Sequence, residues 1–237
     1  MHAVMNKMIQ PIEGLMHLFF PNCCEGCGSE LIQNRHKLCL SCWSQLPLTR
    51  FEWHPNNPVE RIFWGRIPLL GASSHLYFTK ESLLQHLMHQ FKYKGAQELG
   101  LELGRSMGRS IQESNRFSNI SGLIPLPLHP SRERKRGYNQ ARVLCEGLSE
   151  ETGIPVFNNL IIRNTATITQ THKSRVERWQ NMVGKFSIPN PRLLQNKDWL
   201  LVDDVITTGA TLEACAAGIL QVPGARLGIA SLAYTNK

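Results

Sequence analysis

One stretch of twelve residues, from Leu200 to Thr211, limits the fold of this chain more than any other feature. It begins with an apolar run, which is typical of a strand buried on both faces. Two adjacent carboxylates follow, then a Thr-Thr-Gly-Ala-Thr turn and a segment with the composition of a helix. The stretch therefore predicts a strand, a tight polar turn and a helix N-terminus. Such an N-terminus binds phosphate through its unpaired first-turn amides and its dipole.

The residue types in the turn indicate a phosphorylated sugar as the ligand. The threonine hydroxyls are hydrogen-bond donors, and Gly209 lets the backbone approach a phosphate closely. Asp203 and Asp204 would repel that phosphate, so we expect them to contact an uncharged ribose diol, whose hydroxyls donate to carboxylates. A phosphate beside a sugar diol describes a phosphoribosyl group. The alternative is a buried strand and a threonine-capped helix that bind no ligand.

Residues 202–211, Val-Asp-Asp-Val-Ile-Thr-Thr-Gly-Ala-Thr, resemble the motif of type I phosphoribosyltransferases that binds 5-phosphoribosyl 1-pyrophosphate (PRPP). In that family the acidic pair holds the ribose hydroxyls and the threonine–glycine loop holds the 5-phosphate. The resemblance implies PRPP as a ligand here, accompanied by Mg(II). The residues that match the motif are Asp203, Asp204, Thr207, Thr208, Gly209, Ala210 and Thr211.

Five of the seven cysteines lie between residues 23 and 42. Two Cys-x2-Cys pairs, Cys24 with Cys27 and Cys39 with Cys42, have the spacing that closes four thiolates around a metal ion. Cys23 offers a second choice for the first pair, but the matching spacing favours Cys24. We expect Zn(II) in a structural role; iron would show the same spacing. Vicinal disulfides would be strained, and a segment this small should depend on its metal to fold.

The composition is that of a folded soluble protein, with 42% hydrophobic and 19% charged residues among 237. Lys and Arg total 26 against 18 Asp and Glu, a formal charge of +8. This excess permits nucleic acid or phosphorylated ligands as partners without requiring either. No apolar run is long enough to span a membrane, and the first twenty residues lack the pattern of a signal peptide. We therefore expect a cytoplasmic protein.

Hydrophobic periodicity predicts strands that alternate with helices along most of the chain. Strands are expected over 69–78, 122–128, 155–162, 198–202 and 226–234, and helices over 83–95, 97–112 and 141–148. This alternation predicts an α/β fold with a doubly wound parallel sheet. We expect four parts: an N-terminal helical segment over 1–20, a zinc ribbon over 21–48, a linker over 49–68 and a phosphoribosyltransferase-like domain over 69–237.

Two basic stretches lie at the ends of predicted elements. Arg134, Lys135 and Arg136 lie in a predicted loop after the strand at 122–128, at the sheet edge where α/β proteins bind ligands. They could neutralise a pyrophosphate, or the loop could be a mobile part of the surface.

Lys92 and Tyr93 end a helix in a basic, aromatic segment that suits nucleic acid or phosphate. Lysines at the C-terminal end of a solvated helix would give the same pattern.

Two further features suit a ligand or single-stranded DNA. Tyr138 follows the basic loop and could stack on a base. Residues 163–178 are polar and include Gln170 and Arg178, so they could close over a ligand as a lid that excludes water. A plain surface segment would have the same composition.

Landmarks along nearly the whole chain resemble the ComF family, bacterial competence-associated proteins that join a zinc ribbon to a phosphoribosyltransferase-like domain. The matching residues are Phe20-Pro21, the two cysteine pairs, 91–93, 124–130, 136–141, Gln170, 177–178, Asn181, Gly184, Phe186 and the Asp-Asp motif. The departures are the extra Cys23 and Lys173, where the family often has an apolar residue. Membership implies a role in natural transformation, in which the protein handles incoming single-stranded DNA with PRPP and Mg(II) as ligands. Competence helicase or recombination proteins could dock on the ribbon.

Two functions remain open on these residues. An enzyme of nucleotide salvage or metabolism would transfer the phosphoribosyl group of PRPP to an acceptor that the sequence does not identify. Mg(II) and the loop 134–136 would then take up the charge of the leaving pyrophosphate, while Asp203 and Asp204 support the ribosyl cation. A binding module would instead hold single-stranded DNA on cationic and aromatic groups, with salt-sensitive affinity. Release of pyrophosphate would distinguish the two.

Overall fold

A computed structural model describes residues 22–31, 36–164 and 185–235 of the chain. The chain divides into two compact units, Met1–Leu46 (unit 1) and Pro47–Lys237 (unit 2). Unit 1 contains the cysteine pairs and the helix α2 (Leu40–Ser44), which begins directly after Cys39. The N-terminal segment 1–20, for which we predict a helix, lies outside the described residues.

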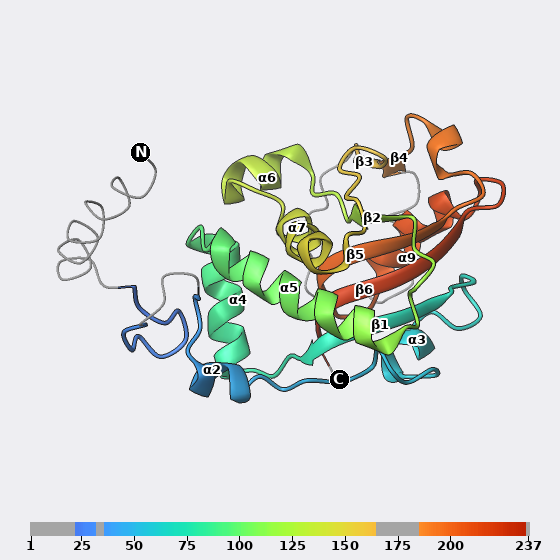
Figure 1. The fold of residues 1–237 in the computed structure, drawn as a ribbon. Coiled ribbons are helices and arrows are strands. Elements are labelled where there is room, and N and C mark those ends of the chain that lie inside the picture. Colours follow the sequence, from blue (N-terminus) through green and yellow to red (C-terminus); the bar gives the residue numbers. More distant parts are fainter. Residues whose placement is uncertain (1–21, 32–35, 165–184, 236–237) are drawn as a thin grey trace, which may run out of the picture. The chain divides into compact units, whose positions relative to one another are not determined.

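Within its described residues, unit 2 is built around a parallel sheet of four strands (Figure 1). The strands are β1 (Gly71–Tyr77), β2 (Gly122–Pro125), β5 (Asp198–Ile206) and β6 (Arg226–Tyr234). Their order in space is β1-β6-β5-β2, and all three pairings are parallel. Residues 198–202 are buried without interruption, as expected for a strand that is covered on both faces.

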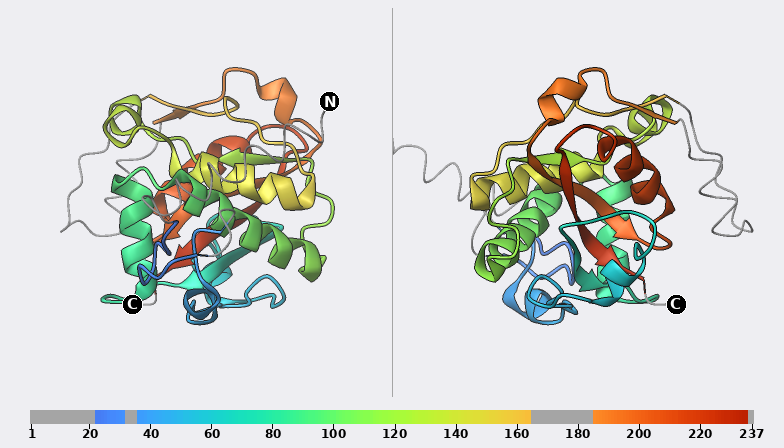
Figure 2. Two further views of the ribbon diagram at one scale, coloured as in Figure 1. Left: turned by 60° about the vertical axis from the view of Figure 1, so that its left-hand side comes forward. Right: turned by 90° about the vertical axis from the view of Figure 1, so that its right-hand side faces the viewer.

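Helices cover both faces of this sheet (Figures 1 and 2). One face carries α4 (Leu83–Tyr93), α5 (Gln97–Ser114) and α7 (Gln140–Thr152). The opposite face carries α9 (Ala210–Ile219) and the short α3 (Pro58–Arg61). The predicted α/β fold with a doubly wound parallel sheet is therefore confirmed.

Glycines allow α5 and α7 to pack with their backbones in contact. A Cβ atom added to Gly147 of α7 would lie 2.2 Å from the carbonyl oxygen of Leu101, and one added to Gly104 of α5 would lie 2.5 Å from that of Leu144. Both distances are far shorter than a van der Waals contact, so no larger residue fits without separating the helices. This close packing fixes α7, which follows β2, against the sheet.

Residues 129–136 form a helix rather than the predicted loop. The helix is α6 (Pro130–Arg136), and the His129 side chain caps its first turn by accepting from the Ser131 amide. Proline at the first helical position has a fixed φ that suits the start of a helix, and three cations in the last turn interact favourably with the helix dipole. Gly137 ends the helix with φ 85°. These capping signals outweigh the polar composition on which the prediction of a loop was based.

Residues 155–162 form less strand than predicted. Val156 makes an isolated parallel bridge to Leu123 on the outer side of β2. A short strand β3 (Ile162–Arg163) pairs antiparallel with β4 (Phe186–Ser187), and a 3-10 helix, η1 (Pro191–Leu194), precedes β5. Two consecutive asparagines, Asn158 and Asn159, have low strand propensity and interrupt the pairing.

The segment 49–68, predicted as a linker, contributes to the core of unit 2. Phe51, Val59 and Phe63 are buried there. Asn57 caps α3 and also donates from Nδ2 to the carbonyl oxygen of Ala72 at 2.8 Å, which ties the segment to β1. Across the described part of the chain, no helix combines the length and the apolar character needed to cross a membrane.

Candidate ligand-binding site and cysteine cluster

The carboxyl ends of β2 and β5 form the topological switch point of the sheet. These neighbouring strands are parallel, but the chain leaves β2 toward α7 on one face and leaves β5 toward α9 on the other (Figure 2). Open α/β sheets bind ligands where two such connections diverge. The turn predicted to bind phosphate lies at this position.

Asp203 and Asp204 lie near the carboxyl end of β5, and Asp204 has a cationic partner. The Asp204 amide donates to Asp203 Oδ1 at 2.8 Å. Lys92 Nζ, from the last turn of α4, lies 2.9 Å from Asp204 Oδ2, with only 21% and 15% of the two side chains exposed. The lysine that the sequence associates with DNA or phosphate is thus paired with the acidic residues.

Burial and the Asp204 carboxylate raise the pKa of Asp203 to about 8. Lys92 and Arg163 oppose this rise because their positive charges favour the ionised form. Arg163 is itself buried on β3, and burial together with nearby Arg132 lowers its pKa. Arg163 is the first residue of the predicted lid 163–178, and Arg132 lies close after the predicted strand at 122–128. No local signal singles out either residue as part of the acidic site.

The turn after β5 has the form expected of a phosphate site. A small pocket there is lined by Asp203 and by residues 205–212. Gly209 is the N-cap of α9 with φ 72° and supplies no side-chain hydrogen bond to the first turn. A Cβ atom at this position would collide with Ile62 and Phe63, so the turn requires glycine for both its conformation and its packing. Arg66 also reaches this region, with its Nη1 atom 3.2 Å from Glu213 Oε2 in the first turn of α9.

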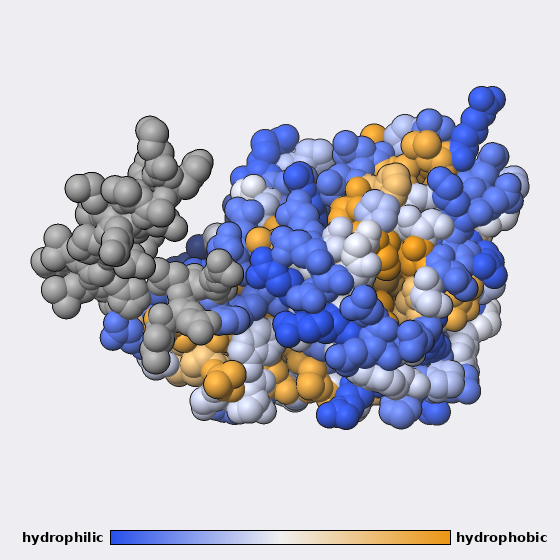
Figure 3. All heavy atoms as spheres, viewed as in Figure 1, coloured by the Kyte–Doolittle hydropathy of each residue, from blue (hydrophilic) through white to orange (hydrophobic). Residues whose placement is uncertain are grey.

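The predicted pyrophosphate residues lie on α6. Arg134 and Lys135 are exposed, and hydrophilic residues dominate the surface over α5 and α6 in Figure 3. Arg136 is half-buried: its guanidinium lies 5.7 Å from the centre of the Tyr93 ring, and Nη1 donates to Gln140 Oε1 at 2.9 Å. Tyr93 itself remains 59% exposed.

Tyr138 cannot stack on a base in this structure. Its side chain is buried, and its hydroxyl donates to the backbone carbonyl of Phe91. The ring packs against Phe91 with 5.8 Å between the ring centres. Tyr138 therefore fixes the end of α4 directly beside Lys92. Gln170 and Arg178 lie outside the described residues.

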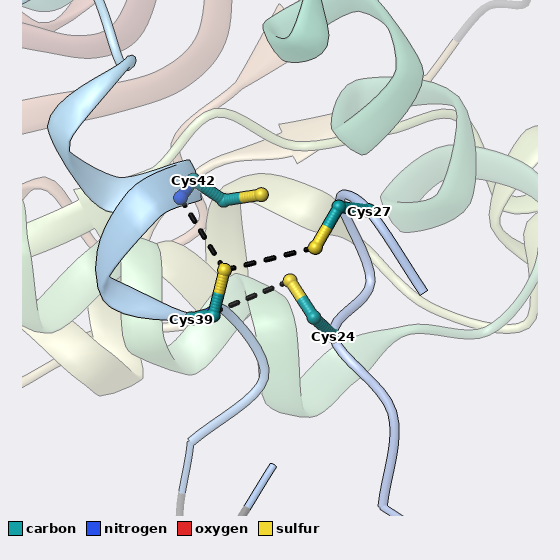
Figure 4. Close-up of side chains that lie close together, drawn as sticks. All are labelled: Cys24, Cys27, Cys39 and Cys42. Carbon is teal, nitrogen blue, oxygen red and sulfur yellow. Dashed lines mark hydrogen bonds between the residues drawn. The ribbon is translucent and has the colours of Figure 1, made fainter. Parts of the chain in front are cut away.

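The four cysteines of the two Cys-x2-Cys pairs converge (Figure 4). All four Sγ atoms of Cys24, Cys27, Cys39 and Cys42 lie within 4.8 Å of one another, and Cys27 Sγ and Cys39 Sγ are 3.7 Å apart. A tetrahedral site with metal–sulfur bonds of about 2.3 Å has sulfur–sulfur distances of about 3.8 Å. Cys23 is exposed and lies outside this cluster. The group can hold a metal such as zinc.

Backbone amides and a hydroxyl surround the cluster with donors that favour thiolates. The amides of Gly26 and Cys39 lie 3.4 and 3.3 Å from Cys24 Sγ. The Ser29 hydroxyl, 3.0 Å from Cys27 Sγ, is the main cause that lowers the pKa of Cys27 to about 6. Burial raises the pKa of Cys42, so a bound cation would be needed to ionise all four thiols together.

The parallel sheet, the acidic pair at the end of β5 and the glycine-containing turn before α9 define unit 2 as a type I phosphoribosyltransferase-like domain. The cysteine cluster that precedes it is compatible with a zinc ribbon. One solved structure that aligns with part of this chain is glutamine PRPP amidotransferase from Bacillus subtilis complexed with ADP and GMP. It aligns with a TM-score of 0.40 and 18% identity over 60% of this chain and 30% of that chain.

The chain belongs to the ComF family. Competence protein F of Haemophilus influenzae is 29% identical over 205 residues, which cover 84% of this chain and 85% of that protein. DNA utilization protein YhgH of Escherichia coli O157:H7 is 30% identical over 155 residues, 64% of this chain and 67% of that protein. No protein-family model matches the chain.

Proposed function

We propose that unit 2 binds PRPP together with Mg(II), with the ribose hydroxyls on Asp203 and Asp204 and the 5-phosphate at residues 207–211. The observation that carries this proposal is the direct succession of an acidic pair and a helix N-terminus without a side-chain cap at the switch point of the sheet. The first feature suits a neutral diol and the second suits an anion. A phosphoribosyl group has both.

Calorimetry tests this proposal directly. PRPP with Mg(II) is titrated into the wild type and into Asp204→Asn, with Glu98→Gln, an exposed carboxylate of α5, as the matched control. A hydrogen bond to a charged group contributes roughly 1.5–3 kcal/mol, so Asp204→Asn should weaken binding by about tenfold or more. The control should bind as the wild type does. Folded wild type that releases no heat with PRPP would refute the proposal.

We propose further that the protein acts in the use of incoming single-stranded DNA in the cytoplasm. Support comes from the names of its relatives, which are competence and DNA utilization proteins. The net charge of +8, the exposed cations Arg134 and Lys135 and the exposed ring of Tyr93 are the elements that a single strand uses. Competence helicase or recombination proteins are proposed as further partners.

Single-stranded DNA binding should weaken steeply with salt. The double variant Arg134→Gln/Lys135→Gln should weaken it at low salt and reduce the slope of log K against log salt by about 0.7 for each phosphate that the variant no longer neutralises. Fluorescence anisotropy of a labelled oligonucleotide at several salt concentrations measures both. An unchanged slope would exclude α6 from the DNA path.

The alternative function, a true phosphoribosyltransferase of nucleotide salvage, is favoured by the complete acidic pair and turn. This function requires that the wild type release pyrophosphate from PRPP in the presence of a candidate base. The Asp204→Asn variant should abolish that release. DNA binding without pyrophosphate release supports the binding module instead.

We propose Zn(II) as the resident metal of the cysteine cluster. Four cysteine sulfurs at tetrahedral spacing leave no open position for a substrate, so the metal would be structural. Mass spectrometry of the native protein should give one zinc ion per chain. One iron ion per chain would contradict the assignment of zinc.

A further inference from the structure

The ion pair of Lys92 with Asp204 changes the charge of the acidic site. Lys92 Nζ lies 2.9 Å from Asp204 Oδ2, and both side chains are largely buried. The buried Arg163 supplies a second positive charge that acts on Asp203. Lys92 therefore offsets the negative charge of Asp204, while burial and Asp204 raise the pKa of Asp203 so that this carboxyl is largely protonated near neutral pH.

The position of Lys92 is fixed by its neighbours on α4. Phe91 is fully buried, and its backbone carbonyl accepts the Tyr138 hydroxyl. Tyr93 lies beside the Arg136 guanidinium from α6. The last turn of α4 is therefore held on both sides of Lys92, so its ammonium group is directed at Asp204 before any ligand arrives.

We infer that Lys92 is a specificity-determining residue: it neutralises Asp204 and thereby reserves the acidic pair for an uncharged sugar diol while excluding a free divalent cation. This inference rests on the proposed function and deepens it. It implies that Mg(II) enters this site only together with a polyphosphate ligand that brings its own negative charge.

The chemistry of the two ligands explains this selection. A hard cation such as Mg(II) is held by anionic oxygens, commonly one or two carboxylates. At Asp204 the ammonium already occupies one oxygen and would repel a divalent charge. A diol carries no charge and donates hydrogen bonds here, and an ionised carboxylate offers about four acceptor positions. Asp204 can therefore hold Lys92 and a hydroxyl at the same time.

The experiment measures binding of a free divalent cation and binding of a sugar phosphate separately. Zinc-loaded protein is titrated with Mn(II) alone, followed by electron paramagnetic resonance, and separately with ribose 5-phosphate without metal, followed by calorimetry. The variant is Lys92→Met, and Lys94→Met, an exposed lysine two residues further on, is the matched control. Lys92→Arg restores the positive charge.

Lys92→Met should bind Mn(II) at least about tenfold more tightly than the wild type and bind ribose 5-phosphate several-fold more weakly. Lys94→Met and Lys92→Arg should behave as the wild type in the Mn(II) titration. If Lys92→Met fails to fold, Lys92→Gln, which keeps a polar side chain, is measured instead.

Two results would overturn the inference while leaving the proposed function intact. One is a Lys92 variant that binds ribose 5-phosphate and Mn(II) as Lys94→Met does. The other is tight binding of Mn(II) to the wild type without any ligand, together with loss of that binding in the Asp204→Asn variant. Wild type that binds neither PRPP nor ribose 5-phosphate would instead remove the proposed function, on which the inference depends.

Discussion

At the scale of single residues, Asp203 couples the site to the stability of the fold. Burial and Asp204 raise its pKa to about 8, whereas an aspartate in an unfolded chain has a pKa of about 4. Between these values the folded state holds a proton that the unfolded state has released. The contribution of Asp203 to the free energy of unfolding therefore decreases as pH rises from about 4 to 8. Strongly shifted carboxyls of this kind are concentrated at functional sites.

Asp203→Asn should remove this pH dependence. We expect the variant to gain in melting temperature relative to the wild type as pH rises from 5 to 9, by about 2–4 °C for each kcal/mol in a chain of this size. Thermal unfolding of both proteins at four pH values measures the difference. A difference that stays constant from pH 5 to 9 would contradict a raised pKa of Asp203.

At the scale of elements, the contact of α5 with α7 depends on the absence of side chains. Gly147→Ala would place a Cβ atom 2.2 Å from the Leu101 carbonyl oxygen. Alanine is normally the better helix former by about 1 kcal/mol, but this clash should reverse the sign. We expect a loss of about 1–3 kcal/mol in the free energy of unfolding, which urea denaturation measures.

Gly218→Ala on α9 is the matched control. An added Cβ atom there would meet only Ile188 Cδ1, at 3.8 Å, which is an ordinary contact. This variant should be neutral or more stable by about 0.5 kcal/mol. If Gly147→Ala and Gly218→Ala lose the same amount of unfolding free energy, the close backbone contact of α5 with α7 is not the cause of the loss.

At the scale of the whole molecule, the two compact units should depend differently on metal. Among the described residues, unit 1 has few that are buried beyond its cysteines, whereas unit 2 has a continuous core around its sheet. Chelation should therefore increase hydrogen exchange in residues 36–46 without increasing it in β5 and β6. Cys42→Ser should reproduce the effect of the chelator, and Cys23→Ser should not, because Cys23 lies outside the cluster. If residues 36–46 exchange as slowly in the chelated wild type and in Cys42→Ser as in the metal-loaded wild type, then the cysteine cluster does not stabilise unit 1.

Most of the elements could be predicted from local sequence. The periods of hydrophobic residues place β6 at its observed bounds and α4 and α5 within two residues of theirs, because a buried strand or amphipathic helix leaves its pattern in adjacent residues. The predicted loop over α6 is wrong, although the histidine cap, the proline and the terminal glycine of this helix are all local signals. The acidic pair, the turn and each cysteine pair stand out in the sequence because each is a contiguous motif.

Local sequence is enough to predict the parallel α/β fold class, the metal-binding pattern of the cysteines and the strand–turn–helix at residues 200–211, since each depends on neighbours along the chain. Three contacts follow only from the packing of the folded chain: Lys92 pairs with Asp204, Tyr138 is buried against Phe91, and Ile62 and Phe63 cover Gly209. These contacts join residues from different elements. Their partners depend on how the helices and the 49–68 segment pack on the sheet, and no local pattern records that packing.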